Sequence, residues 1–300
     1  MKKTTILSFA AVLMLALSGC KDASVDISNG SEELFKVGNT KVTNDDIFRS
    51  LFLNGGYSEV NSMVSKIIYD KEVPENDEIK KEAKDALAQA KKDMGENFLE
   101  TIKQYYGCEN EDAFYTKVSL PNAQLNALTK KFLNEHAEEQ ITTYKPVKVR
   151  IIACTSEDNA KKALEAVQKG TGFEEAAKQY GKTDTYKGAE EIVNQSSGLP
   201  SAVWSKISVI TDKEAMINEV ITDSVADAEN PVYYVVKVTN TKALEEFKDE
   251  AIKSILDKAT SAKTDAMKFY LNKYNFRVYD IDIYNTYKTN NPDYLVQDQE

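Results

Sequence analysis

The 300-residue chain has few histidines and cysteines, the side chains that bind zinc and often act as catalytic bases or nucleophiles. It contains one histidine and three cysteines, and no two cysteines lie close together in the sequence. A zinc site needs a cluster of cysteine and histidine ligands, so this composition excludes one. A glycine-rich phosphate loop and a motif that joins a nucleophilic serine to a histidine are also missing. We therefore expect no metal and no other cofactor.

Positively charged residues are outnumbered by negatively charged ones. Lysine and arginine number 38 against 48 aspartate and glutamate residues, so the formal net charge at pH 7 is −10. A surface of this sign repels nucleic acids and anionic lipid headgroups alike. We expect no nucleic-acid partner, and attachment to a membrane would need an anchor other than surface charge.

The apolar run at the N-terminus is too short to cross a bilayer. It covers twelve residues, Ile6 to Leu17, and follows two lysines, which is typical of a secretory signal. It ends in Leu17-Ser18-Gly19-Cys20, which resembles a bacterial lipobox, where the cysteine thiol receives a diacylglycerol. We predict a lipoprotein signal peptide at residues 1–19, a lipid on Cys20 and a flexible tether at residues 20–33. The alternative is an ordinary cleaved signal in which the cysteine has no role.

Two cysteines remain once Cys20 is lipidated. Cys108 lies in a predicted loop, and Cys154 ends a predicted strand. A disulfide between them is compatible with a location outside the cytosol, but two cysteines do not make a disulfide framework. Unpaired structural thiols are the preferred interpretation, and a disulfide stays open.

Helical periodicity dominates from residue 44 to about residue 141. Before it, a Gly38-Asn39 turn between apolar positions indicates a small hairpin, and Thr43 can cap the first helix. Apolar residues then recur at three- and four-residue steps, and the region is divided into several helices by Gly55-Gly56, Pro74, Gly107 and Pro121. The only histidine, His136, closes an apolar stripe, so we expect it to pack rather than to catalyse.

A compact α/β block follows at Lys145-Pro146, where the period of the apolar residues changes. Its predicted elements are strands at residues 147–153 and 232–238 and helices at residues 156–169, at residues 173–180 and from Pro200. A polar loop is expected between residue 181 and Pro200. The block has its own hydrophobic face and can therefore form a small domain.

The helical spacing returns beyond Thr241 and continues for about seven turns, from Leu244 to Phe269. Tyr279, Ile281 and Ile283 then alternate as in a last strand. Neither element has a partner nearby in the sequence, so the simplest packing is against the helices of the first half. The predicted fold class is α+β: a discontinuous, mostly helical domain at residues 34–144 and 241–300, with a small α/β domain inserted at residues 145–240.

Several segments form a recognisable set. They are the lipobox, the opening VGNTKVTNDDIF, the segment YGCENEDAFYTKVSLPNAQLNALTKKFL and the ending FRVYDIDIY. Together they resemble the PrsA-type extracytoplasmic foldases, relatives of the SurA-type periplasmic chaperones. The central block resembles a parvulin-type peptidyl-prolyl isomerase domain through SEDNAKKALEAVQKGTGFEEAAKQYGKTD and PVYYVVKV.

The resemblance covers nearly the whole chain and implies both a location and a partner. The chain would be lipid-anchored to the outer face of a bacterial cell membrane. Its partners would be unfolded or nascent secreted proteins, and a homodimer stays open.

The resemblance also implies where catalytic groups would lie. Parvulins are described with two central histidines and a nearby cysteine or aspartate. On this chain the two histidine positions fall on Ile151 and Tyr234, and the carboxylate position falls on Asp184. Isoleucine forms no hydrogen bond and tyrosine does not replace an imidazole, so the central polar network is missing. We therefore expect the isomerase activity to be lost.

The proline-binding pocket departs from the family pattern as well. Parvulins are described with a methionine and a phenylalanine around the proline ring, and these positions fall on Gly198 and Ala202. Leu199 and Trp204 lie close enough in the sequence to refill part of the space. These residues are candidates for substrate binding, with the pocket reshaped.

Three functions remain open at this point. The preferred one is a membrane-tethered chaperone that holds unfolded chains, with aromatic residues of its helices either in a binding surface or in the core: Tyr57, Tyr69, Tyr105, Tyr106, Phe114, Tyr115, Phe132, Phe269 and Tyr270. The second is an active isomerase that uses an atypical site near Asp184. The third is a solute-binding or surface-interaction lipoprotein, which the clustering of strands in the middle of the chain disfavours.

Overall fold

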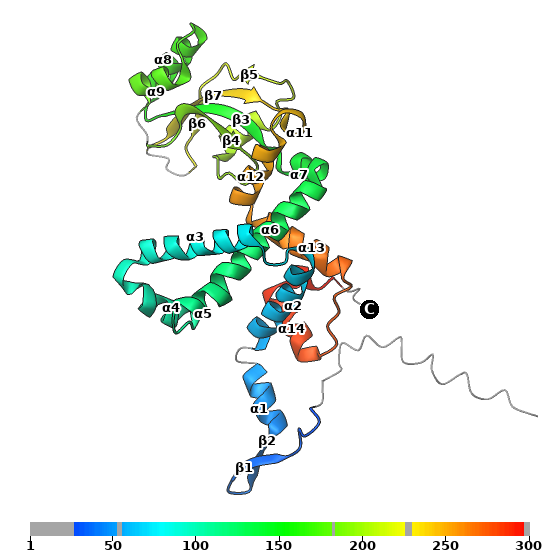
Figure 1. Cartoon of the computed structure of the whole chain (residues 1–300). Helices are drawn as coiled ribbons and strands as arrows, with labels where there is room; N and C mark the ends of the chain where they lie inside the picture. Colours follow the sequence, from blue (N-terminus) through cyan, green and yellow to red (C-terminus); the bar gives the residue numbers. More distant parts are fainter. Residues whose placement is uncertain (1–26, 53–55, 182–183, 226–229, 297–300) are drawn as a thin grey trace, which may run out of the picture. The chain divides into compact units, whose positions relative to one another are not determined.

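The computed structural model describes residues 27–52, 56–181, 184–225 and 230–296 (Figure 1). These residues belong to two units. The first unit is drawn from Met1–Lys80 and Met267–Glu300, and the second from Lys81–Ala266. The predicted signal peptide and Cys20 lie outside the described residues. Within them, no helix combines the length and the apolar character needed to cross a membrane.

A hairpin and a capped helix open the first unit. β1 (Glu33–Val37) and β2 (Thr40–Thr43) pair antiparallel, and Gly38 occupies the turn with a φ of +62°. The Thr43 hydroxyl caps α1 (Asn44–Leu51) by accepting the N–H of Asp46, whose carboxylate accepts the N–H of Thr43 in return. The predicted hairpin and N-cap are therefore confirmed.

Aromatic packing joins α2 (Tyr57–Glu72) to the C-terminal helix α14 (Ile281–Asn290) within this unit. The rings of Tyr57 and Tyr287 meet edge to face, with centroids 5.0 Å apart. The hydroxyl of Tyr274 also donates a 2.6 Å hydrogen bond to Glu72 at the end of α2. The C-terminal segment therefore returns to the N-terminal helices of its own unit.

The strand predicted at residues 279–283 is wrong. Asp280 caps a helix there, because its carboxylate accepts the N–H groups of Asp282 and Ile283 at 2.9 and 3.1 Å. The helical register buries Tyr284 and Tyr287, three residues apart, whereas Tyr279 stays exposed. Alternation over five residues was too short a pattern to separate a strand from the start of this helix.

The second unit begins its helical part with a hairpin of helices. α3 (Asp77–Met94) leads to a short 3₁₀ turn, and α4 (Phe98–Tyr106), α5 (Glu111–Phe114) and α6 (Leu120–Glu135) return beside it (Figure 1). Its core consists of Phe98, Ile102, Cys108 and Phe114. Gly107 ends α4 in the left-handed conformation, with a φ of +61°, as a helix-terminating glycine commonly does. α7 (Ala137–Tyr144) then leads to the sheet.

A five-stranded antiparallel sheet forms the rest of the second unit (Figure 1). Its strands are β3 (Val147–Cys154), β4 (Lys187–Val193), β5 (Ala215–Met216), β6 (Ile221–Asp223) and β7 (Val232–Asn240). The order is β4-β3-β7-β5, and β6 also pairs with β7. Alternate residues of each strand face opposite sides. One side packs on α8 (Glu157–Gln168) and α9 (Phe173–Tyr180), and the other on α10 (Ser201–Ile207).

The structure confirms the two strands and three helices predicted for the α/β block. The hydroxyl of Ser156 caps α8 by accepting the N–H of Asn159 at 3.3 Å. The prediction of a polar loop between residue 181 and Pro200 missed a strand, because β4 lies within this segment. This strand lies at an edge of the sheet and carries exposed charges such as Glu190, and these hide its apolar residues from a periodicity search.

The helix predicted from Leu244 to Phe269 is divided into three. α11 (Ala243–Glu246), α12 (Lys248–Lys258) and α13 (Thr260–Lys273) are separated at Phe247 and Ala259, which have non-helical dihedral angles. Both residues are buried. The apolar spacing therefore continues through both breaks, and this is why periodicity predicted one helix.

The remaining cysteines and the histidine behave as structural residues. Cys108 and Cys154 are buried and unpaired, so the preferred interpretation of unpaired thiols is confirmed. Burial raises the pKa of the Cys154 thiol to about 11, so it stays protonated at neutral pH. The imidazole of His136 lies at the end of α6, half-buried, with its ring 5.0 Å from that of Phe132.

Within the second unit, hydrogen bonds and an ion pair connect the sheet to α12. The buried amide of Asn194, just after β4, donates to the carbonyl and to the hydroxyl of Ser254, each at 3.0 Å. Lys148 of β3 pairs with Glu250 at 2.9 Å, and Lys258 donates to the carbonyl of Ile192 at 2.6 Å. These contacts place one helix of the helical part against the edge of the sheet.

Candidate functional site

The two positions expected to carry histidines lie on one face of the sheet. Ile151 on β3 pairs with Val236 on β7, and Tyr234 pairs with Ala153. All four belong to one apolar cluster, which α10 covers with Val203 and Ile207. Ile151 is fully buried. A side chain sealed in this way serves the core and is not available to a substrate.

The substrate-binding candidates lie at the margin of the same cluster. Leu199, Ala202 and Trp204 are half-buried and pack against it, whereas Gly198 is exposed with a φ of +68°. The structure therefore brings Leu199, Ala202 and Trp204 to the face that contains Ile151 and Tyr234. The side chains that meet there are apolar or aromatic.

Tyr186 is a member of this face that sequence reasoning missed. Its ring meets that of Tyr234 edge to face, with centroids 6.1 Å apart, and its carbonyl accepts the N–H of Ala153 at 3.2 Å. It adopts a φ of +55°, which is unusual for a residue other than glycine, so no sequence signal points to its position. Its packing on the cluster holds it there.

The two tyrosine hydroxyl groups are poor bases at neutral pH. Burial raises the pKa of both, and the nearby carboxylates of Asp223 and Glu191 raise that of Tyr234 and Tyr186 respectively. Both phenols therefore stay protonated. They can donate a hydrogen bond, but they do not supply a proton acceptor in place of an imidazole.

Asp184 is exposed and precedes Tyr186 by two residues in the chain. In the described part of the chain, no group of three or more histidine, cysteine, aspartate or glutamate residues is placed to hold a metal ion. The arrangement around Ile151 thus resembles a packed core with an aromatic margin.

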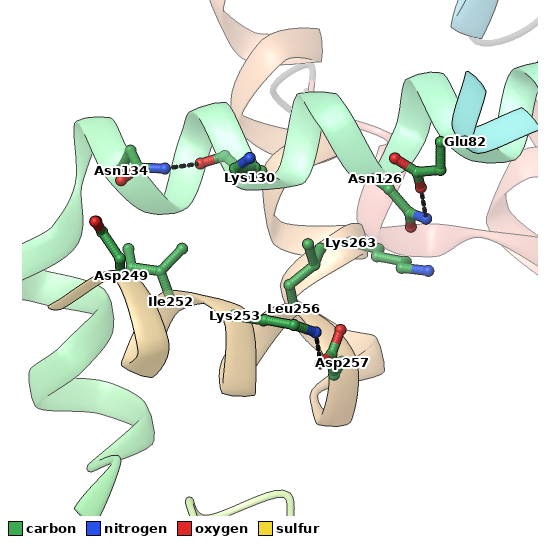
Figure 2. Close-up of a pocket in the computed structure, with 10 residues that line it drawn as sticks. All are labelled: Glu82, Asn126, Lys130, Asn134, Asp249, Ile252, Lys253, Leu256, Asp257 and Lys263. Atoms are coloured by element: carbon green, nitrogen blue, oxygen red, sulfur yellow. Dashed lines mark hydrogen bonds and ion pairs between the residues drawn. The ribbon is translucent and has the colours of Figure 1, made fainter. Parts of the chain in front are cut away.

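A second candidate site lies in the helical part of the second unit. A groove of about 760 Å³ opens between α6 and α12, with contributions from α3 and α13 (Figure 2). We call it the α6–α12 groove, and its lining residues are Glu82, Asn126, Lys130, Asn134, Asp249, Ile252, Lys253, Leu256, Asp257 and Lys263. Eight of the ten have polar or charged side chains. Such a lining suits a polar ligand better than an apolar one.

The groove has regular walls because its residues recur every four positions. Asn126, Lys130 and Asn134 form one row along α6, while Asp249, Lys253 and Asp257 form another along α12. Residues four apart lie above one another on the same face of a helix. Figure 2 shows the two rows on opposite sides, with Ile252 and Leu256 on the side of α12.

Interactions within the groove use residues of both of its walls. The amide of Asn126 donates to Glu82 at 2.7 Å, and that of Asn134 donates to the carbonyl of Lys130 at 2.8 Å. Lys253 pairs with Asp257 one turn further along α12. Asp249 and Lys263, in contrast, form no side-chain hydrogen bond or ion pair with any described residue.

No family model matches the chain, but characterised proteins do. The Bacillus cereus protein named Foldase protein PrsA 3 is 30% identical over 261 residues, which is 85% of this chain and 84% of that protein. The chain belongs to the PrsA foldase family. A second Bacillus cereus protein, Foldase protein PrsA 2, is 23% identical over 299 residues, and the match covers 96% of each chain.

A solved structure supports the PrsA fold for this chain. The crystal structure of foldase protein PrsA from Streptococcus pneumoniae superposes with a TM-score of 0.51 at 21% identity. The match covers 88% of this chain and 99% of that one. The resemblance to PrsA-type proteins and the α+β fold class are therefore confirmed.

The aromatic residues of this PrsA-family chain divide between core and surface. Tyr69, Phe114, Phe132 and Tyr270 are buried. Tyr105 and Tyr106, at the end of α4, are 72% and 47% exposed. Tyr57, Tyr115 and Phe269 are half-buried. Of the nine aromatic residues considered for a binding surface, four thus belong to the core and two are exposed.

Proposed function

We propose that the chain is a lipid-anchored, extracytoplasmic chaperone that binds unfolded secreted proteins and keeps them competent to fold. The observation that carries this proposal is the 30% identity to Foldase protein PrsA 3 over 85% of the chain. The leader that ends in Cys20 supports the anchor and the location outside the cytosol. An acidic net charge leaves the lipid as the means of attachment.

We further propose a division of labour along the chain. Residues 34–144 and 241–300 would form the chaperone domain, and residues 145–240 would form an inserted parvulin-like domain without useful isomerase activity. Rotation about an Xaa-Pro bond faces a barrier of roughly 18–20 kcal/mol, so a catalyst must stabilise the twisted amide strongly. Buried Ile151 and the protonated phenol of Tyr234 support the loss of that ability.

The holding activity is tested with a chemically unfolded client diluted into buffer with the purified full-length chain. We expect light scattering by the aggregating client to fall as the chain is added. The Cys20→Ser variant should keep this activity but leave the membrane fraction when it is expressed in a bacterium, because it cannot be acylated. Unchanged aggregation would overturn the chaperone proposal, and membrane retention of the variant would overturn the anchor. Sedimentation of the same samples distinguishes a monomer from a homodimer.

Isomerase activity is tested separately by exchange NMR on a short Xaa-Pro peptide. We expect the full-length chain to leave the exchange rate at its uncatalysed value, which corresponds to tens of seconds or longer at 25 °C. Faster exchange would contradict the proposed loss of activity. The variants Asp184→Asn and Tyr186→Phe would then show whether the activity resides at the loop aspartate or at the aromatic face.

A further inference from the structure

We propose that the α6–α12 groove binds an extended client segment that carries opposite charges at its two ends. A basic side chain would lie against Asp249 and an acidic one against Lys263. This inference deepens the proposed chaperone function, on which it rests for the nature of the ligand. It assigns one class of client segment to a defined surface of the second unit.

The shape of the groove favours an extended chain. Its walls are straight, because each follows one row of residues at four-residue steps along a helix. The row from Asp249 to Asp257 spans eight residue steps of α12, or about 12 Å of helix. An extended polypeptide covers this length with about four residues, at roughly 3.3 Å each.

The charges of the groove favour opposite ends of the ligand. Asp249 and Lys263 lie at opposite ends in Figure 2, and neither has an ion-pair or hydrogen-bond partner among the described residues. Between them, the Lys253 ammonium is already neutralised by Asp257. A ligand with one charge of each sign would therefore satisfy the two end groups without separating an existing pair.

The α6 wall of the groove suits a peptide backbone. Asn126 and Asn134 each donate one side-chain N–H within the protein, so the carbonyl oxygen and the second N–H of each are left for a bound chain. Half-buried Leu256 offers an apolar contact beside them. Amide groups and an apolar contact can bind any extended chain. The charged residues at the two ends of the groove would therefore determine which client segments bind.

Fluorescent hexapeptides of one length and one apolar centre test the proposal on the full-length chain. One peptide carries lysine and glutamate at its ends, a second carries glutamate at both ends, and a third carries lysine at both. We expect the mixed-charge peptide to bind about fivefold more tightly than either of the others, which is the effect of one exposed charge pair turned from attraction to repulsion. The difference should shrink as salt is added, because both end groups are reached by solvent.

Charge reversal within the groove makes the test specific. Asp249→Lys should shift the preference to the peptide with two glutamates, and Lys263→Glu to the peptide with two lysines. The double variant Asp249→Lys, Lys263→Glu should restore the preference for mixed charge. Glu245→Lys and Lys92→Glu change the net charge equally at exposed positions outside the groove and should leave the preference unaltered.

The outcomes separate this inference from the chaperone proposal. Equal binding of the three peptides, or no binding, overturns the inference even where the chain suppresses client aggregation. The same holds if sedimentation shows that a second copy fills the groove, in which case Asp249→Lys would dissociate a dimer. Selective binding with reversal and rescue supports the inference whether or not aggregation of one chosen client is suppressed.

Discussion

Replacement of Asn194 by alanine is expected to lower the free energy of unfolding of the second unit by about 3 kcal/mol. The Asn194 side chain is only 1% exposed, and its N–H₂ group donates two hydrogen bonds to Ser254 of α12. Its carbonyl accepts the N–H of Ser196 at 2.8 Å. Alanine removes all three bonds and leaves the buried hydroxyl of Ser254 without the amide group whose hydrogen bond it accepts. Each such group costs about 1–3 kcal/mol.

The measurement is denaturant unfolding of the full-length chain, followed by the fluorescence of Trp204. This residue is the only tryptophan and packs against the sheet of the second unit, so its signal reports that unit. Gln195→Ala is the matched control, because the Gln195 side chain is exposed and its backbone N–H still bonds to Tyr144. A loss for Asn194→Ala no larger than that of the control would show that the sheet does not depend on this link to α12.

The sequence predicted those parts of the fold in which apolar spacing agrees with the final structure. β3 and β7 alternate visibly because each places one set of residues against α10 and the other against α8 and α9. β4 is an edge strand with exposed charges at Lys187 and Glu190, so its pattern does not stand out. Asn194 follows β4 in the predicted polar loop. Its role depends on hydrogen bonds to Ser254, sixty residues away in the sequence, and no local sequence pattern predicts such a contact.

The candidate sites also depend partly on contacts between distant segments that the sequence does not predict. The resemblance named Ile151, Tyr234, Leu199, Ala202 and Trp204 as candidate positions, and the structure places all five in or against one apolar cluster. Tyr186 joins them only because the chain adopts a left-handed conformation there, against the preference of its side chain. The α6–α12 groove was not predicted, because its charged rows look like ordinary solvated helix faces until the two helices are placed side by side.

Replacement of Gly188 by alanine is expected to cost the second unit about 3 kcal/mol or more. Gly188 has a φ of +80°, and a Cβ at this position would lie 2.4 Å from the carbonyl oxygen of Phe173 and 2.8 Å from the nitrogen of Glu174. Both atoms belong to the backbone at the start of α9, so no side-chain rotation relieves the overlap. The helix would have to move away from β4, which would disturb its packing over the sheet.

Gly170→Ala provides the matched control for this substitution. Gly170 has a φ of +100°, but no atom lies within 4 Å of a Cβ built on it. It should therefore show the conformational cost alone, about 1–2 kcal/mol. The excess loss at Gly188, read again from Trp204 fluorescence, measures the close approach of α9 to β4. Equal losses at the two glycines would contradict that approach, and α9 would then be free to shift without loosening the sheet that supports the aromatic face.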